Sequence, residues 1–177
     1  MFIIQEKKQK NIAEYLILMY QIEDLLRSFE FDLKRIEKEF VAPQIASSSM
    51  LPTMMEWYAA LAKEMQTNKL DKKGHVTEVL EVTNELIYLH NTLLNMLNDE
   101  KYKDLSERAA QHISAFREKS DLGSIHPIEV CLKALYMKLL LKMKGQEISD
   151  ATEEAFDSMR ILIAYLTKKY HEMYQVQ

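Results

Sequence analysis

Residues 127–145 read PIEVCLKALYMKLLLKMKG, and this stretch decides the fold class. Its apolar side chains form two stripes at the spacing of a helix with 3.6 residues per turn. One stripe contains Ile128, Leu132, Leu135, Leu139 and Met143. The other, roughly opposite, contains Val130, Ala134, Met137 and Leu141. Because a helix that is apolar on two sides is surrounded by other helices, we expect a central helix near residues 126–144 of a bundle.

The rest of the chain repeats the helical period. Apolar spacing and capping residues predict further helices over residues 5–29, 32–41, 52–68, 75–98, 100–119 and 150–174. Gly and Pro number only 3 each among 177 residues, about 3% against a usual 12%. We therefore expect one all-α domain over residues 1–177, a single bundle of six to seven helices. Residues 42–52, with two prolines and three serines, predict a flexible loop.

Charge and cysteine content narrow the setting. The chain has 23 basic and 27 acidic residues, a net charge of −4 without a concentrated basic face, which argues against a nucleic-acid partner. Cys131 is the only cysteine, so no intrachain disulfide forms and a reducing cytoplasm is expected. No apolar run approaches 18 residues, and the apolar start at Met1–Ile4 is too short for a signal peptide. We expect no membrane association.

Metal-ligand spacings are missing from the sequence. Di-metal bundles need Glu-x-x-His, and the residues three before the five histidines are Lys72, Ile87, Ala109, Gly123 and Lys168. We therefore expect no metal and no cofactor. Glu78, Glu81 and Glu85 resemble half of the magnesium motif of all-α nucleotide pyrophosphatases, but the answering carboxylates do not follow in the next helix. A solvated helix face is the favoured interpretation of these three glutamates.

Two polar residues fall on or beside apolar helical stripes. His90 lies near the centre of the stripe of helix 75–98, where an imidazole needs a hydrogen-bonding partner. Glu23 lies at the edge of the stripe of helix 5–29, one turn before Arg27. We expect Glu23 and His90 to meet in one polar cluster, with Arg27 keeping Glu23 ionised. The candidate ligand-binding residues are Tyr20, Glu23, Arg27 and His90. The alternatives are a satisfied core histidine at position 90 and an ordinary surface pair of Glu23 with Arg27.

Several short strings together resemble a family from Bacteroidetes. They are residues 11–15, 21–25, 56–58, 73–75, 129–141 and 147–149. The family is classed as a domain of unknown function, and the similarity extends over nearly the whole chain. This resemblance implies an all-helical bundle and a bacterial cytoplasm. It implies no activity and no site residues.

Two functions follow from these observations. The favoured one is a non-enzymatic cytoplasmic binding or scaffold module whose candidate partners are another protein or a second copy of the chain. The alternative is a helical enzyme or small-ligand binder with a polar pocket around Glu23 and His90. A dry, fully packed interior favours the first function, and a cavity with convergent polar groups favours the second.

Overall fold

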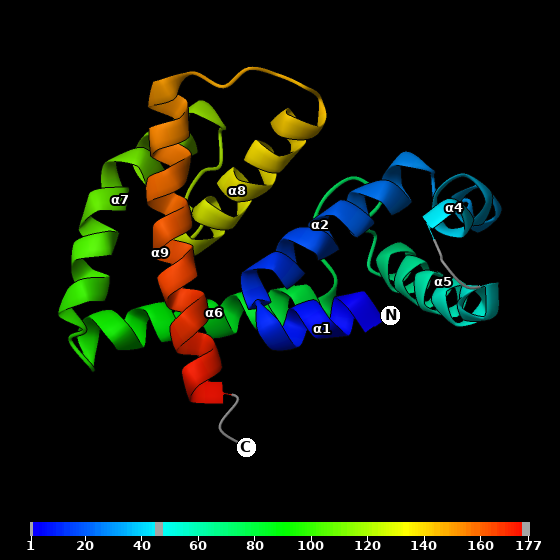
Figure 1. Cartoon of the computed structure of the whole chain (residues 1–177), viewed down its shortest axis with the longest axis horizontal. Coiled ribbons are helices and arrows are strands. Elements are labelled where there is room, and N and C mark those ends of the chain that lie inside the picture. Colours follow the sequence, from blue (N-terminus) through cyan, green and yellow to red (C-terminus); the bar gives the residue numbers. More distant parts are fainter. Residues whose placement is uncertain (1, 45–47, 175–177) are drawn as a thin grey trace.

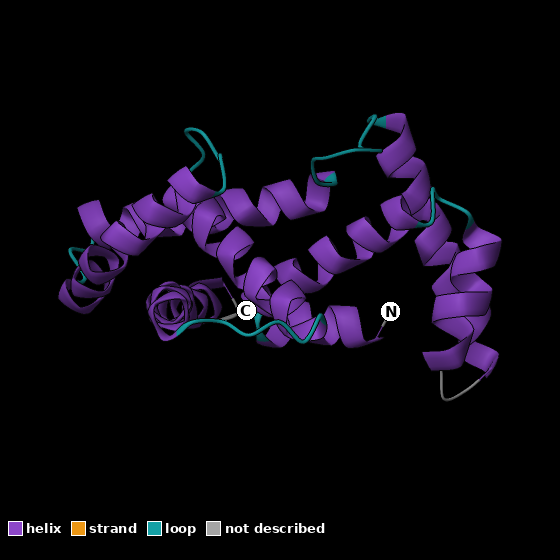
Figure 2. Cartoon of the chain, turned by 90° about the horizontal axis from the view of Figure 1, so that it is seen from above, coloured by secondary structure: helices purple, strands orange, loops and turns teal. Residues whose placement is uncertain are grey.

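The computed structural model describes residues 2–44 and 48–174, and over these ranges it consists of helices joined by turns (Figure 1). The helices are α1 (Phe2–Lys10), α2 (Ile12–Ser28), α3 (Leu33–Ile36), α4 (Ala42–Gln44), α5 (Leu51–Thr67), α6 (Thr77–Asn95), α7 (Glu100–Lys119), α8 (Pro127–Met143) and α9 (Asp150–Tyr174). A π-helix covers Glu37–Val41, and a 3-10 helix covers Ser48–Met50. Figure 2 shows no strand in the described part, which confirms the all-α class.

The described residues contain more helices than the six to seven expected, and one reason is Asn11. The single helix expected over residues 5–29 is divided there into α1 and α2. Asn11 has extended backbone angles (φ −153°, ψ 93°), and its side-chain oxygen accepts a hydrogen bond from the Glu14 amide at 3.1 Å. This is an ordinary N-cap, which satisfies a donor that a new helix would otherwise leave unpaired.

The segment between α2 and α5 is also more divided than expected. Glu30 and Phe31 have positive φ angles of 53° and 61°, and Asp32 then caps α3 by accepting from two backbone amides. The expected helix 32–41 is α-helical at first and continues as the π-helix. The expected loop 42–52 contains α4, the 3-10 helix and the start of α5, while residues 45–47 lie outside the described residues. Its described part is therefore helical rather than irregular.

Helices α5 to α9 begin and end close to the residues that the sequence predicts. Asp99 caps α7 by accepting from the Tyr102 amide at 2.9 Å. His126 caps α8 through the Ile128 amide at 3.2 Å, and Glu129 accepts from the His126 amide in return. These capping contacts involve residues only two or three positions apart, so the sequence pattern predicts where the helices begin.

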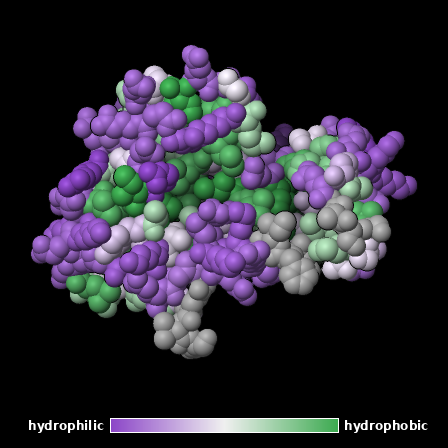
Figure 3. Space-filling model, in the orientation of Figure 1, coloured by the Kyte–Doolittle hydropathy of each residue, from purple (hydrophilic) through white to green (hydrophobic). Residues whose placement is uncertain are grey.

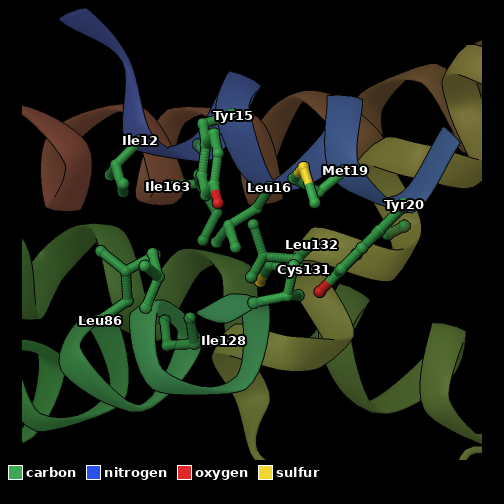
Figure 4. Close-up of a cluster of buried hydrophobic side chains, with 14 of the residues drawn as sticks. Ile12, Tyr15, Leu16, Met19, Tyr20, Leu86, Ile128, Cys131, Leu132 and Ile163 are labelled. Carbon is green, nitrogen blue, oxygen red and sulfur yellow. The ribbon is translucent and has the colours of Figure 1, made fainter. Parts of the chain in front are cut away.

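The N-terminal half of α8 lies at the centre of the core (Figure 4). This helix packs against α2, α6, α7 and α9, and Ile128, Cys131 and Leu132 are fully buried. Burial raises the pKa of the Cys131 thiol to about 12. From Leu135 onward the side chains of α8 are half-buried or exposed, as at Met137 and Met143. The expected central helix is thus central over its first two turns only, because neighbouring helices do not enclose the rest.

Helices α4 and α5 lie at one end of the molecule, and α7 lies at the other (Figures 1 and 2). The segment 68–76 runs from the end of α5 back to the start of α6, and it passes the C-terminal part of α2. No described helix is both long and apolar enough to cross a membrane. The return segment 68–76 thus brings its backbone and side chains into contact with α2.

Candidate functional site

Glu23 of α2 is a fully buried carboxylate with two specific partners. Its Oε1 accepts a hydrogen bond from the backbone amide of Val76 at 2.8 Å. Its Oε2 lies 2.6 Å from Nδ1 of His75. Burying a carboxylate without partners would cost several kcal/mol, so both contacts are needed to keep it there. The amide of Val76 is free to donate because Val76 is the N-cap of α6.

Arg27 holds the return segment against α2. Its guanidinium donates to the carbonyl of Leu70 at 2.9 Å, to the carbonyl of Gly74 at 2.5 Å and to Asp24 at 2.8 Å. Gly74 has φ +96°, and a Cβ there would lie 2.8 Å from Cδ2 of Leu70. Only glycine adopts this conformation without strain, so Gly74 allows the chain to present His75 to Glu23.

Aromatic rings line the other side of His75. The Tyr20 ring stacks on the imidazole with 4.3 Å between ring centroids, and Tyr136 of α8 meets Tyr20 edge to face at 5.7 Å. The Tyr136 hydroxyl donates to Asp24 at 2.7 Å. Burial, together with this contact to a carboxylate, raises the pKa of Tyr136, so the phenol remains a donor. Asp24 therefore has its negative charge shared between Arg27 and Tyr136.

These groups surround a hollow of about 210 Å³, here called the cationic hollow. Its lining residues are Tyr20, Asp24, Arg27, Lys72, Lys73, Gly74, His75, Lys133 and Tyr136. Lys72, Lys73 and Lys133 have no ion-pair partner within residues 2–44 and 48–174, whereas Asp24 is already paired. The lining therefore has an excess of positive charge, and it has the chemistry to hold an anion.

His90 lies elsewhere, and the expected cluster of Glu23 with His90 is wrong. Val76, which contacts Glu23, is 14 positions before His90, and that spacing corresponds to about 21 Å along a helix. His90 Nδ1 is instead 2.7 Å from the Tyr102 hydroxyl, and its ring lies 5.2 Å from that of His126. Burial, with a smaller effect of His126, lowers the pKa of His90 to about 4. These contacts fit the alternative of a satisfied core histidine.

The expected role of Arg27 is also corrected. Arg27 is paired with Asp24 and with two backbone carbonyls, not with Glu23. The two oxygens of Glu23 contact His75 and Val76, and the Arg27 hydrogen bonds go to other acceptors. Of the candidate residues, Tyr20 and Arg27 line the cationic hollow, and Glu23 lies directly behind His75.

Sequence reasoning did not place Asp24, Lys72, Lys73, His75, Lys133 or Tyr136 among the candidate ligand-binding residues. His75 follows a helix-breaking glycine, and that position was a signal that the chain turns sharply beside a titratable side chain. No periodic pattern shows which helix such a turn will meet. The described residues contain no group of three or more His, Cys, Asp or Glu side chains arranged to hold a metal ion.

The glutamates that resemble a magnesium motif face outward. Glu78 pairs with Lys8 at 2.5 Å, Glu85 accepts from the Tyr170 hydroxyl at 2.6 Å, and Glu81 is exposed. The three side chains therefore have separate surroundings, and within the described residues they belong to no group of His, Cys, Asp or Glu side chains that could hold a metal ion. This arrangement agrees with the solvated helix face favoured by the sequence.

A second concave surface lies between α2, α8 and α9, where Figure 3 shows apolar side chains exposed between polar ones. Its volume is about 730 Å³, and its apolar lining is Ala13, Ile17, Leu135, Leu139, Ile163 and Ala164. Lys138 lies in it and pairs with Glu153 and with Asp157. Its charged groups of both signs are thus largely paired with each other, in contrast to those of the cationic hollow.

Comparison with known proteins gives one result. No curated protein and no solved structure matches the chain. The family described as "Domain of unknown function (DUF4924)" matches residues 1–176. Because this match covers nearly every residue, including both helices and the return segment that form the cationic hollow, the chain belongs to the DUF4924 family.

Proposed function

We propose that this chain is a binding module for a small anionic molecule, which occupies the cationic hollow. One observation supports the proposal above all others: three lysines, which have no ion-pair partner among the described residues, converge with Arg27 on a hollow whose wall includes His75. Positive groups held together repel one another, and a bound anion relieves that repulsion while gaining charge-assisted hydrogen bonds.

The size of the hollow restricts the ligand. At about 210 Å³ it is smaller than the roughly 300–1,000 Å³ of sites for drug-sized molecules. An inorganic oxyanion or an organic acid of a few heavy atoms fits this space. A protein segment or a large cofactor does not.

The hollow favours the second of the two functions that the sequence left open. Polar groups converge beside Glu23, which is the feature expected of a small-ligand binder. Tyr20, Glu23 and Arg27 therefore remain in the proposed site, and His90 does not. The lysines and Arg27 of the lining supply positive charge for an anion, so the proposal is one of binding.

Isothermal titration calorimetry tests the proposal with inorganic phosphate, sulfate, lactate and propionate as probes. The full chain is expected to bind at least one of these anions, and the affinity should fall as salt is raised from about 50 to about 500 mM. The Lys133→Gln variant should bind about threefold to tenfold more weakly, because it loses one partly screened charge.

Lys144→Gln is the matched control, since Lys144 lies at the other end of the same helix and outside the hollow. It should bind as tightly as the unchanged chain. Absence of binding for every probe, or an equal loss in the two lysine variants, would disprove the proposal.

The cellular compartment and the bacterial origin of the chain are also part of the proposal. The single Cys131 supports a reducing cytoplasm, where thiols persist. A bacterial origin in Bacteroidetes is what the sequence resemblance implies. Phosphate and small organic acids are abundant in such a compartment, so the proposed ligands are available there.

A further inference from the structure

The buried carboxylate of Glu23 determines which nitrogen of His75 carries a proton. An ionised carboxylate only accepts hydrogen bonds, and here one oxygen accepts from the Val76 amide. The other oxygen, 2.6 Å from Nδ1 of His75, therefore requires a hydrogen on Nδ1. A neutral imidazole has one donor nitrogen and one acceptor nitrogen, so in the neutral ring Nε2 of His75 is the acceptor.

Nε2 is the ring nitrogen that remains for a ligand. The imidazole lines the cationic hollow, its side chain is 21% exposed, and Nε2 has no protein partner in the described part of the chain. The stacked Tyr20 ring covers one face of the imidazole and restricts its rotation. The hollow thus combines several cationic donors with one fixed acceptor.

We propose that the cationic hollow selects anions that carry their own O–H group, which donates to Nε2 of His75 while the lysines hold the negative oxygens. This inference rests on the proposed function and narrows its ligand class. Hydrogen phosphate and small hydroxy acids have this chemistry. Sulfate and simple carboxylates do not, because at neutral pH they present only lone pairs to the lone pair of Nε2.

The first experiment compares matched anions by calorimetry at about pH 8, where hydrogen phosphate still carries one O–H group. Phosphate should bind at least about tenfold more tightly than sulfate, because sulfate leaves two acceptors facing each other. Lactate and propionate form the second pair, which tests whether the O–H group that binds Nε2 belongs to a hydroxy acid or to an inorganic oxyanion. A preference for lactate assigns a hydroxy acid, and a preference in the phosphate pair alone assigns an inorganic oxyanion.

The Glu23→Gln variant tests the mechanism of selection. Its amide oxygen can still accept from Val76, but its amide nitrogen donates to Nδ1 of His75 and so places the ring proton on Nε2. The ratio of phosphate to sulfate affinity should then fall to about one or below. If the variant only lost packing, its affinities for phosphate and for sulfate would instead fall by the same factor.

Two further measurements apply if Glu23→Gln does not fold. The ¹⁵N shifts of His75 in the unchanged chain should show a protonated Nδ1 and an unprotonated Nε2. His75→Gln, which offers both a donor and an acceptor at a partly exposed position, should bind phosphate and sulfate within about twofold of each other.

The outcomes separate this inference from the proposed function. If the unchanged chain binds none of the four anions, the proposed function is wrong. If it binds phosphate and sulfate equally, or if His75 carries its proton on Nε2, the cationic hollow still binds anions and only the inferred selection is overturned.

Discussion

Acidification should destabilise the fold through His90, because this side chain is neutral in the native core. The residue is only 6% exposed, and its two ring contacts are the Tyr102 hydroxyl at 2.7 Å and the His126 ring at 5.2 Å. Neither group carries a negative charge that would compensate a proton on the imidazole. Burial, and then His126, lower the pKa of His90 from 6.5 to about 4.

The sign of the effect follows from comparing the folded and unfolded states. Above about pH 6.5 His90 is neutral in both states, and its contribution to stability is fully present. As pH falls below 6.5, the unfolded chain binds a proton that the folded chain excludes until about pH 4. The shift corresponds to about 2 to 3 kcal/mol after allowance for solvent screening of the ring. This amount is a large fraction of the 5–15 kcal/mol that stabilises a typical domain.

Urea unfolding followed by circular dichroism, at several values between about pH 7.5 and pH 4.5, measures this effect. The comparison is with His90→Gln, which does not titrate in this range and can still hydrogen-bond to Tyr102. The unchanged chain should lose about 2 kcal/mol more than the variant over this range. All other titrating groups are shared by the two proteins, so the difference isolates His90. If the two curves of stability against pH are parallel, the reasoning is refuted.

Three other predictions concern the core, the return segment and the segment between α4 and α5. Cys131, buried with a pKa raised to about 12, should react with a thiol reagent only as fast as the chain unfolds, and rapid stoichiometric labelling of the native protein would contradict this. Gly74→Ala should lower the free energy of unfolding, measured in urea, by about 1–3 kcal/mol and should also weaken anion binding, because φ +96° and the 2.8 Å approach to Leu70 leave no room for a Cβ. Unchanged stability would show that the return segment adapts to the extra methyl group. Limited proteolysis should cut first within residues 42–52, and a first cut inside α8 would show that the assignment of the core is wrong.

Local signals were enough to predict most of the helices. The expected helices over 52–68, 100–119 and 150–174 correspond to α5, α7 and α9 within about one residue at each end. The reason is that a helix is built from contacts three and four residues apart, and its caps lie within the same short range. The apolar stripe was less informative at Asn11, because the spacing of apolar residues continues across that residue while the backbone does not.

Sequence also showed that Glu23 and His90 point toward the interior, and both are buried. Helical angle gives the direction of a side chain around its axis, but it does not give the level at which two helices cross. The structure places the end of α2 beside the start of α6, so Glu23 meets His75 and Val76, while His90 lies far along α6. Which of the two histidines contacts Glu23 is therefore determined by the position at which α2 crosses α6.

The composition and period of this sequence determined an all-α fold, most of the helix ends from α5 onward and a set of inward polar residues. The cationic hollow was decided only by tertiary structure. Its members come from α2, the return segment 68–76 and α8, and they meet because Arg27 ties two loop carbonyls to α2 and because Gly74 permits the turn. Those contacts join residues more than 40 positions apart, and no periodic pattern records a contact at that separation.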